Sequence, residues 1–163
     1  MSGPFLYEKI KYAYAHPAFR DGKCNGPSLV DLSFMTPEEQ IRLALWMRNV
    51  GEGMEHEGRN KPSWLFRSLE LAAAKVYKQN NIWHYHCGPY EGSYPRNHQM
   101  TDNRLSENND GRTSGPVYHY AKQQDSVIVI GYSRIHEPFP TSTSKSNPLR
   151  YRSNMWAQGL PHG

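Results

Sequence analysis

The stretch VYHYAKQQDSVIVIGYSRIH, residues 117–136, decides how we interpret the fold. Val117–Lys122 predicts one strand, and a four-residue turn leads from it into a second strand over 127–132, so the two form a β-hairpin. The run Val127–Ile130 is apolar at every position. Both faces of that second strand should therefore be buried, and we expect it at the centre of a sheet.

A further strand is predicted over 82–87, where the sequence reads IWHYHC. Successive side chains of a strand point to opposite faces. His84 and His86 should therefore share one face, with Trp83, Tyr85 and Cys87 on the other.

Two helices are predicted before this strand, and a short strand within residues 5–16 before them. The first helix begins at Thr36-Pro37-Glu38-Glu39, where Thr36 caps the helix and Glu39 completes a capping box, and it ends at Gly51. The second is predicted from Pro62 to about Gln79. Its apolar residues recur at helical spacing, namely Leu65, Leu69, Ala72 and Val76.

These elements predict an α+β fold in which a helical hairpin packs on a small antiparallel sheet. Residues 88–116 are rich in glycine, proline and small polar residues, and they predict a long polar loop. We expect one domain over 1–140 and an irregular, basic C-terminal tail over 141–163.

Composition narrows the class of protein. Only 37% of the 163 residues are hydrophobic, and mean hydropathy is −0.83. No apolar run approaches the roughly 20 residues of a membrane span, and no signal-peptide pattern is visible at the N-terminus. Two cysteines make no disulfide framework. We therefore expect a cytoplasmic protein that does not bind membranes.

The charged and aromatic residues point to a nucleic-acid partner. The formal net charge is +4, and the chain has 11 tyrosines and 4 tryptophans. Histidine can add positive charge near neutral pH. Six of the 8 histidines lie in the second half, at His84, His86, His98, His119, His136 and His162. Basic groups that bind phosphate and flat rings that stack on bases together favour RNA.

Several of these residues are candidates for one catalytic patch. Arg134 and His136 share a face where the last strand ends, and neighbouring strands would bring His84, His86 and His119 toward them. RNA-binding candidates are Tyr118, Tyr120, Tyr132, Arg150 and Arg152. The patch lacks a nucleophile, but RNA carries its own in the 2′-hydroxyl. Histidines that move protons and an arginine that grips phosphate would suffice to cleave it, with no metal ion or cofactor.

Two other interpretations remain open. The spacing His84-x-His86-x4-Glu91 matches part of the cupin metal motif, in which imidazoles and a carboxylate bind a divalent ion. The chain would then be a metal-dependent enzyme or binding protein. Alternatively, the histidines are structural, and the chain is a non-catalytic interaction protein.

Over about residues 62–140 the chain resembles the RelE-like bacterial toxins. The resemblance rests on the order of elements and on VYHY at 117–120, QDS at 124–126, VIVI at 127–130 and SRIH at 133–136. The Arg-x-His ending is similar to that of YoeB-type members, and the His-x-His strand before a long loop is similar to that of YafO-type members.

This resemblance implies a ribosome-dependent endoribonuclease that cleaves mRNA and is neutralised by a cognate antitoxin. It implies that Arg134 holds phosphate and that His136 is an acid or base. His84 and His86 would face the same substrate, and Tyr120 would align with a tyrosine of the family's strand.

Overall fold

The predicted hairpin lies in the middle of a sheet. The computed structural model describes residues 10–52, 58–66, 69–70, 75–90, 114–123, 125–135 and 149. In it, β8 (Val117–Gln123) pairs antiparallel with β9 (Ser126–Ser133). On its other side β9 pairs in parallel with β1 (Tyr12–Ala15) and antiparallel with β3 (Leu29–Val30). Every residue of β9 after Ser126 is buried, which confirms the prediction of a central strand.

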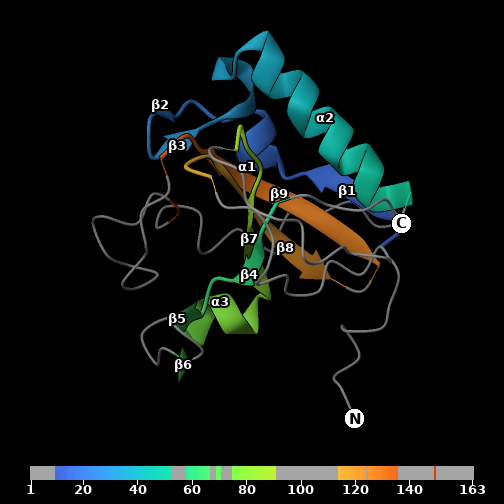
Figure 1. The fold of residues 1–163 in the computed structure, drawn as a ribbon, viewed down its shortest axis with the longest axis vertical. Helices are drawn as coiled ribbons and strands as arrows, with labels where there is room; N and C mark the ends of the chain where they lie inside the picture. Colours follow the sequence, from blue (N-terminus) through green and yellow to red (C-terminus); the bar gives the residue numbers. More distant parts are fainter. Residues whose placement is uncertain are drawn as a thin grey trace.

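The sheet continues outward from both members of the hairpin (Figure 1). Next to β8 lies β7 (Ile82–His86), and next to β7 lies β4 (Asn60–Pro62), both antiparallel. At the other end β3 pairs with β2 (Asn25–Gly26). The seven-stranded sheet thus runs β2-β3-β9-β8-β7-β4, with β1 beside β9 off this path. The predicted strand over 82–87 is confirmed, and the one within 5–16 is confirmed in its last part.

The first predicted helix is confirmed as α2 (Pro37–Glu52). Its capping box forms as expected, because the Thr36 amide donates to Glu39 Oε1 at 2.8 Å and the Glu39 amide donates to Thr36 Oγ1 at 3.2 Å. α2 lies along one side of the sheet (Figure 1). It buries Leu43, Trp46 and Val50 there.

The prediction of one helix over 62–79 is wrong. β4 ends at Pro62, the first residue of this segment, and two short strands follow, β5 (Leu65–Phe66) and β6 (Leu69–Glu70). The one-turn helix α3 (Lys75–Gln79) comes after them. Strand pairing outweighs the helical spacing, because Leu65 and Leu69 lie in β5 and β6, which pair antiparallel with each other, and the Ser63 amide donates to the Ile82 carbonyl at 3.0 Å beside the β4–β7 ladder. Pro62 is tolerated because β4 is an edge strand. The fold is therefore α+β, without the expected helical hairpin over these residues.

Each face of the sheet has its own apolar core. Toward α2 the core is aromatic, and Trp46 lies at its centre. The opposite face packs Ile82, Ile128 and Ile130 against Tyr77 of α3. Leu149, from the predicted tail, is fully buried in this second core. The rest of the predicted tail over 141–163 lies outside the described residues, and so does the predicted loop over 88–116 except for its two ends, 88–90 and 114–116.

A bulge in β9 determines which face its last residues occupy. His119 pairs with Gly131, but Tyr120 pairs with Val129, so Ile130 is an extra residue in β9. An extra residue reverses the alternation of side chains beyond it. Tyr132 therefore packs on the same face as Val129, toward α2.

The helices of the described segments include none with the length and apolar composition needed to cross a membrane.

Candidate functional site

A row of basic side chains crosses three strands on the face away from α2. Lys61 of β4 pairs with His84 of β7, and His84 pairs with His119 of β8. His86 lies two residues beyond His84 on the same face, as the sequence predicts, and the two rings are 5.5 Å apart between centroids. We call Lys61, His84, His86 and His119 the histidine row. No residue of β4, β7, β8 or β9 is acidic, so these strands place no carboxylate in the row.

His86 is held in one tautomer. Its Nδ1 lies 2.8 Å from the Ser114 carbonyl oxygen. The Ser114 amide N–H also lies 3.3 Å from Nδ1, but the carbonyl contact is shorter and a carbonyl oxygen only accepts, so we assign the proton to Nδ1 and the lone pair of the neutral ring to Nε2. Burial lowers the pKa of His86, and the charges of Arg59 and Lys61 lower it further, against the opposing effect of the Ser114 bond. The ring is therefore neutral near pH 7, and Nε2 is a basic nitrogen.

His84 is less buried than His86 and stands edge-on to it, at an interplanar angle of 72°. Its Nδ1 lies 3.0 Å from the hydroxyl of Ser63, the residue that follows β4. Both rings are thus oriented by hydrogen bonds at Nδ1. Two oriented imidazoles side by side are suited to proton transfer in opposite directions.

His119 is fully buried, and its side chain is hydrogen-bonded to Ser133 within the fold. The Ser133 hydroxyl donates to the Ser28 carbonyl at 2.6 Å, so it must accept the 2.8 Å hydrogen bond from His119 Nε2. In this arrangement His119 does not act as a base toward Ser133. The pair instead ties β8 and β9 to the loop before β3.

Arg134 is not part of the histidine row. Because of the bulge it follows Tyr132 onto the side of α2, where its guanidinium makes two hydrogen bonds to Glu39, from Nε at 2.9 Å and from Nη2 at 2.8 Å. Hydrogen bonding from Arg134 is the main reason that the pKa of Glu39 falls to about 2, and Tyr132 also donates to this carboxylate at 2.8 Å. Glu39 therefore occupies the Nε–Nη2 edge of the guanidinium, and its negative charge opposes the binding of a phosphate to Arg134.

The three candidate tyrosines also lie on the side of α2, within the aromatic core. Tyr118, Tyr120 and Tyr132 are at most 4% exposed. Tyr118 and Tyr120 pack around Trp46, at centroid distances of 5.1 and 5.6 Å. The Tyr120 hydroxyl donates to Asn60 Oδ1 at 2.6 Å. In this position the rings stabilise the core and offer almost no surface to a base.

Four candidates lie outside the described residues, namely Glu91, His136, Arg150 and Arg152. The carboxylate of the alternative metal site is therefore not described. Within the described segments, no three His, Cys, Asp or Glu side chains are grouped as metal ligands. Nδ1 of both His84 and His86 already faces a protein oxygen, so neither Nδ1 is placed to bind a metal.

Three residues that shape the row were missed by the sequence analysis. Arg59 and Lys61 lie between the two predicted helices and Ser114 lies in the predicted polar loop, so none of the three was a candidate. Lys61 alternates with the buried Asn60 and Pro62, which is a weak strand signal. Only the pairing of β4 with β7 shows that the lysine and the histidines share a face.

Comparison of the chain with protein-family models, with curated proteins and with solved structures gives no match.

Proposed function

We propose that this chain is an endoribonuclease in which His86 and His84 act as a general base and a general acid. The observation that carries the proposal is the imidazole pair, with ring centroids 5.5 Å apart and His86 fixed as the neutral Nδ1–H tautomer. A neutral imidazole beside the cations Arg59 and Lys61 suits proton transfer at a phosphodiester.

In the proposed reaction, His86 Nε2 removes the proton from a ribose 2′-hydroxyl. The 2′-oxygen attacks the adjacent phosphorus, and the bond from phosphorus to the 5′-oxygen breaks. The imidazolium form of His84 gives its proton to that 5′-oxygen. The products are a 2′,3′-cyclic phosphate and a 5′-hydroxyl end, and Lys61 and Arg59 stabilise the phosphate charge during transfer.

Resemblance to the RelE-like toxins supports the proposed biological setting. That resemblance rests on a strand, two helices and three strands in order; the strand, the first helix and the three antiparallel strands β7, β8 and β9 occur in that order, whereas the second helix does not form. We therefore propose mRNA on the ribosome as the substrate, the cytoplasm as the location and a cognate antitoxin protein as the partner. His136, which ends the SRIH motif, remains a candidate for a third catalytic group.

Cleavage of RNA by the purified chain, with and without ribosomes, tests the proposal. His86→Ala and His84→Ala should each lower the rate by about 10²–10⁴-fold. A 2′-deoxy substitution at the cleaved position should abolish the reaction, and product ends should carry the cyclic phosphate. Folding of each variant is checked by circular dichroism.

Arg134→Gln is the matched control, because it removes a cation that was predicted in the site but lies on the other face. It should retain the cleavage rate within about threefold under conditions where it is folded. If the two histidine variants cleave RNA as fast as the wild type, the proposal is wrong. If they are inactive and cleavage requires a bound divalent ion, the metal-dependent alternative replaces it.

A further inference from the structure

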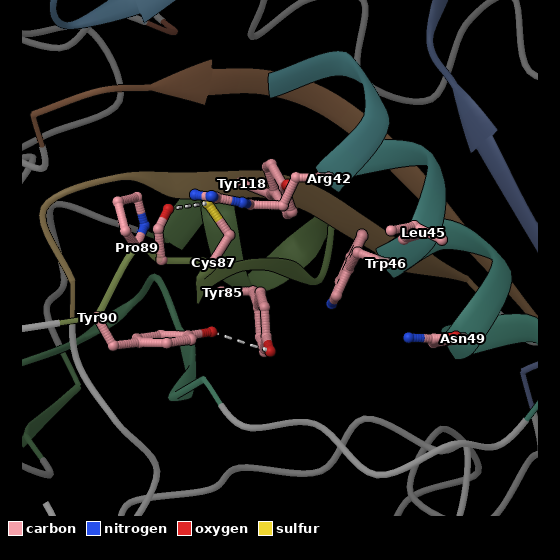
Figure 2. A pocket seen from close by; sticks show the side chains of 10 residues that line it. Arg42, Leu45, Trp46, Asn49, Tyr85, Cys87, Pro89, Tyr90 and Tyr118 are labelled. Carbon is pink, nitrogen blue, oxygen red and sulfur yellow. Dashed lines mark hydrogen bonds between the residues drawn. The ribbon is translucent and has the colours of Figure 1, made fainter. Parts of the chain in front are cut away.

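A cavity of about 370 Å³ opens between α2 and the end of β7, on the face opposite the histidine row (Figure 2). Arg42, Trp46 and Asn49 line it from α2, and Tyr85 lines it from β7. Tyr90, just after β7, forms another part of the wall. A cavity of this size holds one small ligand.

The floor of the cavity is aromatic and rigid. Trp46 stacks with Tyr85 at a centroid distance of 5.3 Å and an interplanar angle of 29°. The Gly58 amide donates to the Tyr85 hydroxyl at 2.9 Å. A Cβ on Gly58 would clash with the His86 carbonyl oxygen and the Tyr90 hydroxyl. The close approach of these segments therefore depends on a glycine at position 58.

The turn after β7 places Tyr90 beside this floor. Gly88 has φ of +85°, a conformation that favours glycine, and a Cβ there would lie only 3.0 Å from the Tyr90 ring. The Tyr90 hydroxyl donates to the His86 carbonyl oxygen at 2.8 Å and lies 3.4 Å from the Tyr85 hydroxyl (Figure 2). This contact ties the wall of the cavity to the backbone of the histidine row.

The cavity also carries positive charge. Among the described residues, Arg42 makes neither a hydrogen bond nor an ion pair, although Arg48 pairs with Glu52 and Arg134 pairs with Glu39 on either side of it. No carboxylate of the described segments lines the cavity. Figure 2 shows Arg42 extending from α2 toward Cys87 and Pro89. An arginine in this setting is available to bind an anion.

Two other side chains complete the chemistry of the cavity. Asn49 points from α2 into the space and makes no hydrogen bond to the described residues, so its amide offers both donors and an acceptor (Figure 2). Cys87, at the floor, is not a nucleophile at neutral pH, because burial raises its pKa to about 12. The cavity is therefore suited to binding, with an aromatic floor, a cation and an amide.

From this set we infer that the cavity binds one nucleotide of single-stranded RNA. The base would lie against the half-buried Tyr90 side chain, Asn49 would read its edge, and Arg42 would hold its phosphate. The inference rests on the proposed function, since it makes the cavity the base-selecting site of the RNA that the histidine row cleaves. His86 and Cys87 are consecutive residues of one chain segment, so the two sites flank the end of β7.

Binding of the four ribonucleoside 5′-monophosphates to the purified chain, measured by calorimetry, tests the inference. We expect one nucleotide to bind at least tenfold more tightly than ribose 5-phosphate, and Arg42→Gln to weaken that binding at least tenfold. Arg48→Gln is the matched control on the same helix and should bind as the wild type does. Equal binding of ribose 5-phosphate, no binding of any nucleotide, or indifference to Arg42→Gln in a folded variant would each overturn the inference.

Cleavage by the wild-type chain separates this inference from the proposed function. If RNA is cleaved and no nucleotide binds, the cavity has no role in base selection and the endoribonuclease proposal stands. If a nucleotide binds in an Arg42-dependent way but RNA is not cleaved, the catalytic proposal fails and the binding site stands without it.

Discussion

The two faces of strands β7, β8 and β9 differ in what their polar groups do. On the face toward α2, Tyr120 donates to Asn60, and Arg134 and Tyr132 both donate to Glu39, so these polar groups are used within the fold. On the opposite face, His84 and His86 stand side by side next to two cations, Arg59 and Lys61, and their Nδ1 atoms face the Ser63 hydroxyl and the Ser114 carbonyl. Basic and aromatic residues of these strands therefore differ in role according to the face that they occupy. Those toward α2 stabilise the fold, and those on the opposite face form the candidate site.

The largest loss of stability should come from a substitution at the centre of the aromatic core between α2 and the sheet. Trp46→Ala removes a ring that is 5% exposed and contacts three tyrosines, so it should lower the free energy of unfolding by about 3–5 kcal/mol. Urea denaturation measures this. Leu45→Ala, at a neighbouring position that is 49% exposed, should change it by less than about 0.5 kcal/mol. Equal losses for the two variants would contradict a core centred on Trp46.

The second-largest effect should be a loss of stability at low pH, caused by protonation of Glu39 on the same face of the sheet. The pKa of Glu39 is about 2 in the folded chain, against an ordinary value of 4.5, chiefly because Arg134 donates to it. A lowered carboxyl pKa stabilises the fold above about pH 4.5, and this stabilisation is lost as pH falls from 4.5 toward 2. Because the Arg134 side chain is 36% exposed, solvent screening limits the contribution to about 2 kcal/mol.

Glu39→Gln should therefore lower the free energy of unfolding at pH 7 by about 2 kcal/mol. The variant should also lose less stability than the wild type as the pH falls from 4.5 toward 2. Thermal unfolding at a series of pH values provides the measurement, and Glu38→Gln on the exposed side of the same helical turn is the control. A Glu39→Gln variant whose acid decline matches that of the wild type would show that the pair with Arg134 does not stabilise the fold.

A smaller loss of unfolding free energy is expected when the hydroxyl of Tyr120 is removed. Tyr120→Phe keeps the ring but removes the hydroxyl that donates to Asn60 Oδ1 at 2.6 Å in a buried setting, which should cost about 1–2 kcal/mol. Tyr12→Phe, at a ring that is 47% exposed, should be neutral. A neutral Tyr120→Phe would mean that this hydroxyl contributes nothing to joining β8 and β4.

Much of the fold was predictable because local signals agree with the tertiary structure. The capping box at Thr36 and Glu39, the apolar run of β9 and the alternation in β7 each form as the sequence predicts. The spacing over 62–79 wrongly predicted a helix, because strand pairing, of β4 with β7 and of β5 with β6, decides the conformation of the first part of this segment.

The site was predictable only in part, chiefly because β9 contains one extra residue, Ile130. Counting by twos from Ile130 places Arg134 on the face of the histidines. The extra residue opposite His119 and Tyr120 reverses that count, so Arg134 reaches Glu39 instead. Nothing in the local sequence other than Gly131 marks a bulge, and Lys61 joins the row only through the pairing of β4.

The smallest effect, and the one that bears most on the proposed reaction, should appear at His86. Burial lowers the pKa of this imidazole below its ordinary value of 6.5, so the unfolded chain takes up the proton more readily than the folded one. Its contribution to stability is therefore complete above pH 6.5 and declines as pH falls below that value. His86→Asn keeps a donor near the Ser114 carbonyl but cannot titrate, so the difference in unfolding free energy between wild type and variant should shrink from pH 7 to pH 5. Parallel curves over this range would show that His86 is protonated as easily in the folded chain as in the unfolded one, and the ring would then not be the preset neutral base that the proposed cleavage requires.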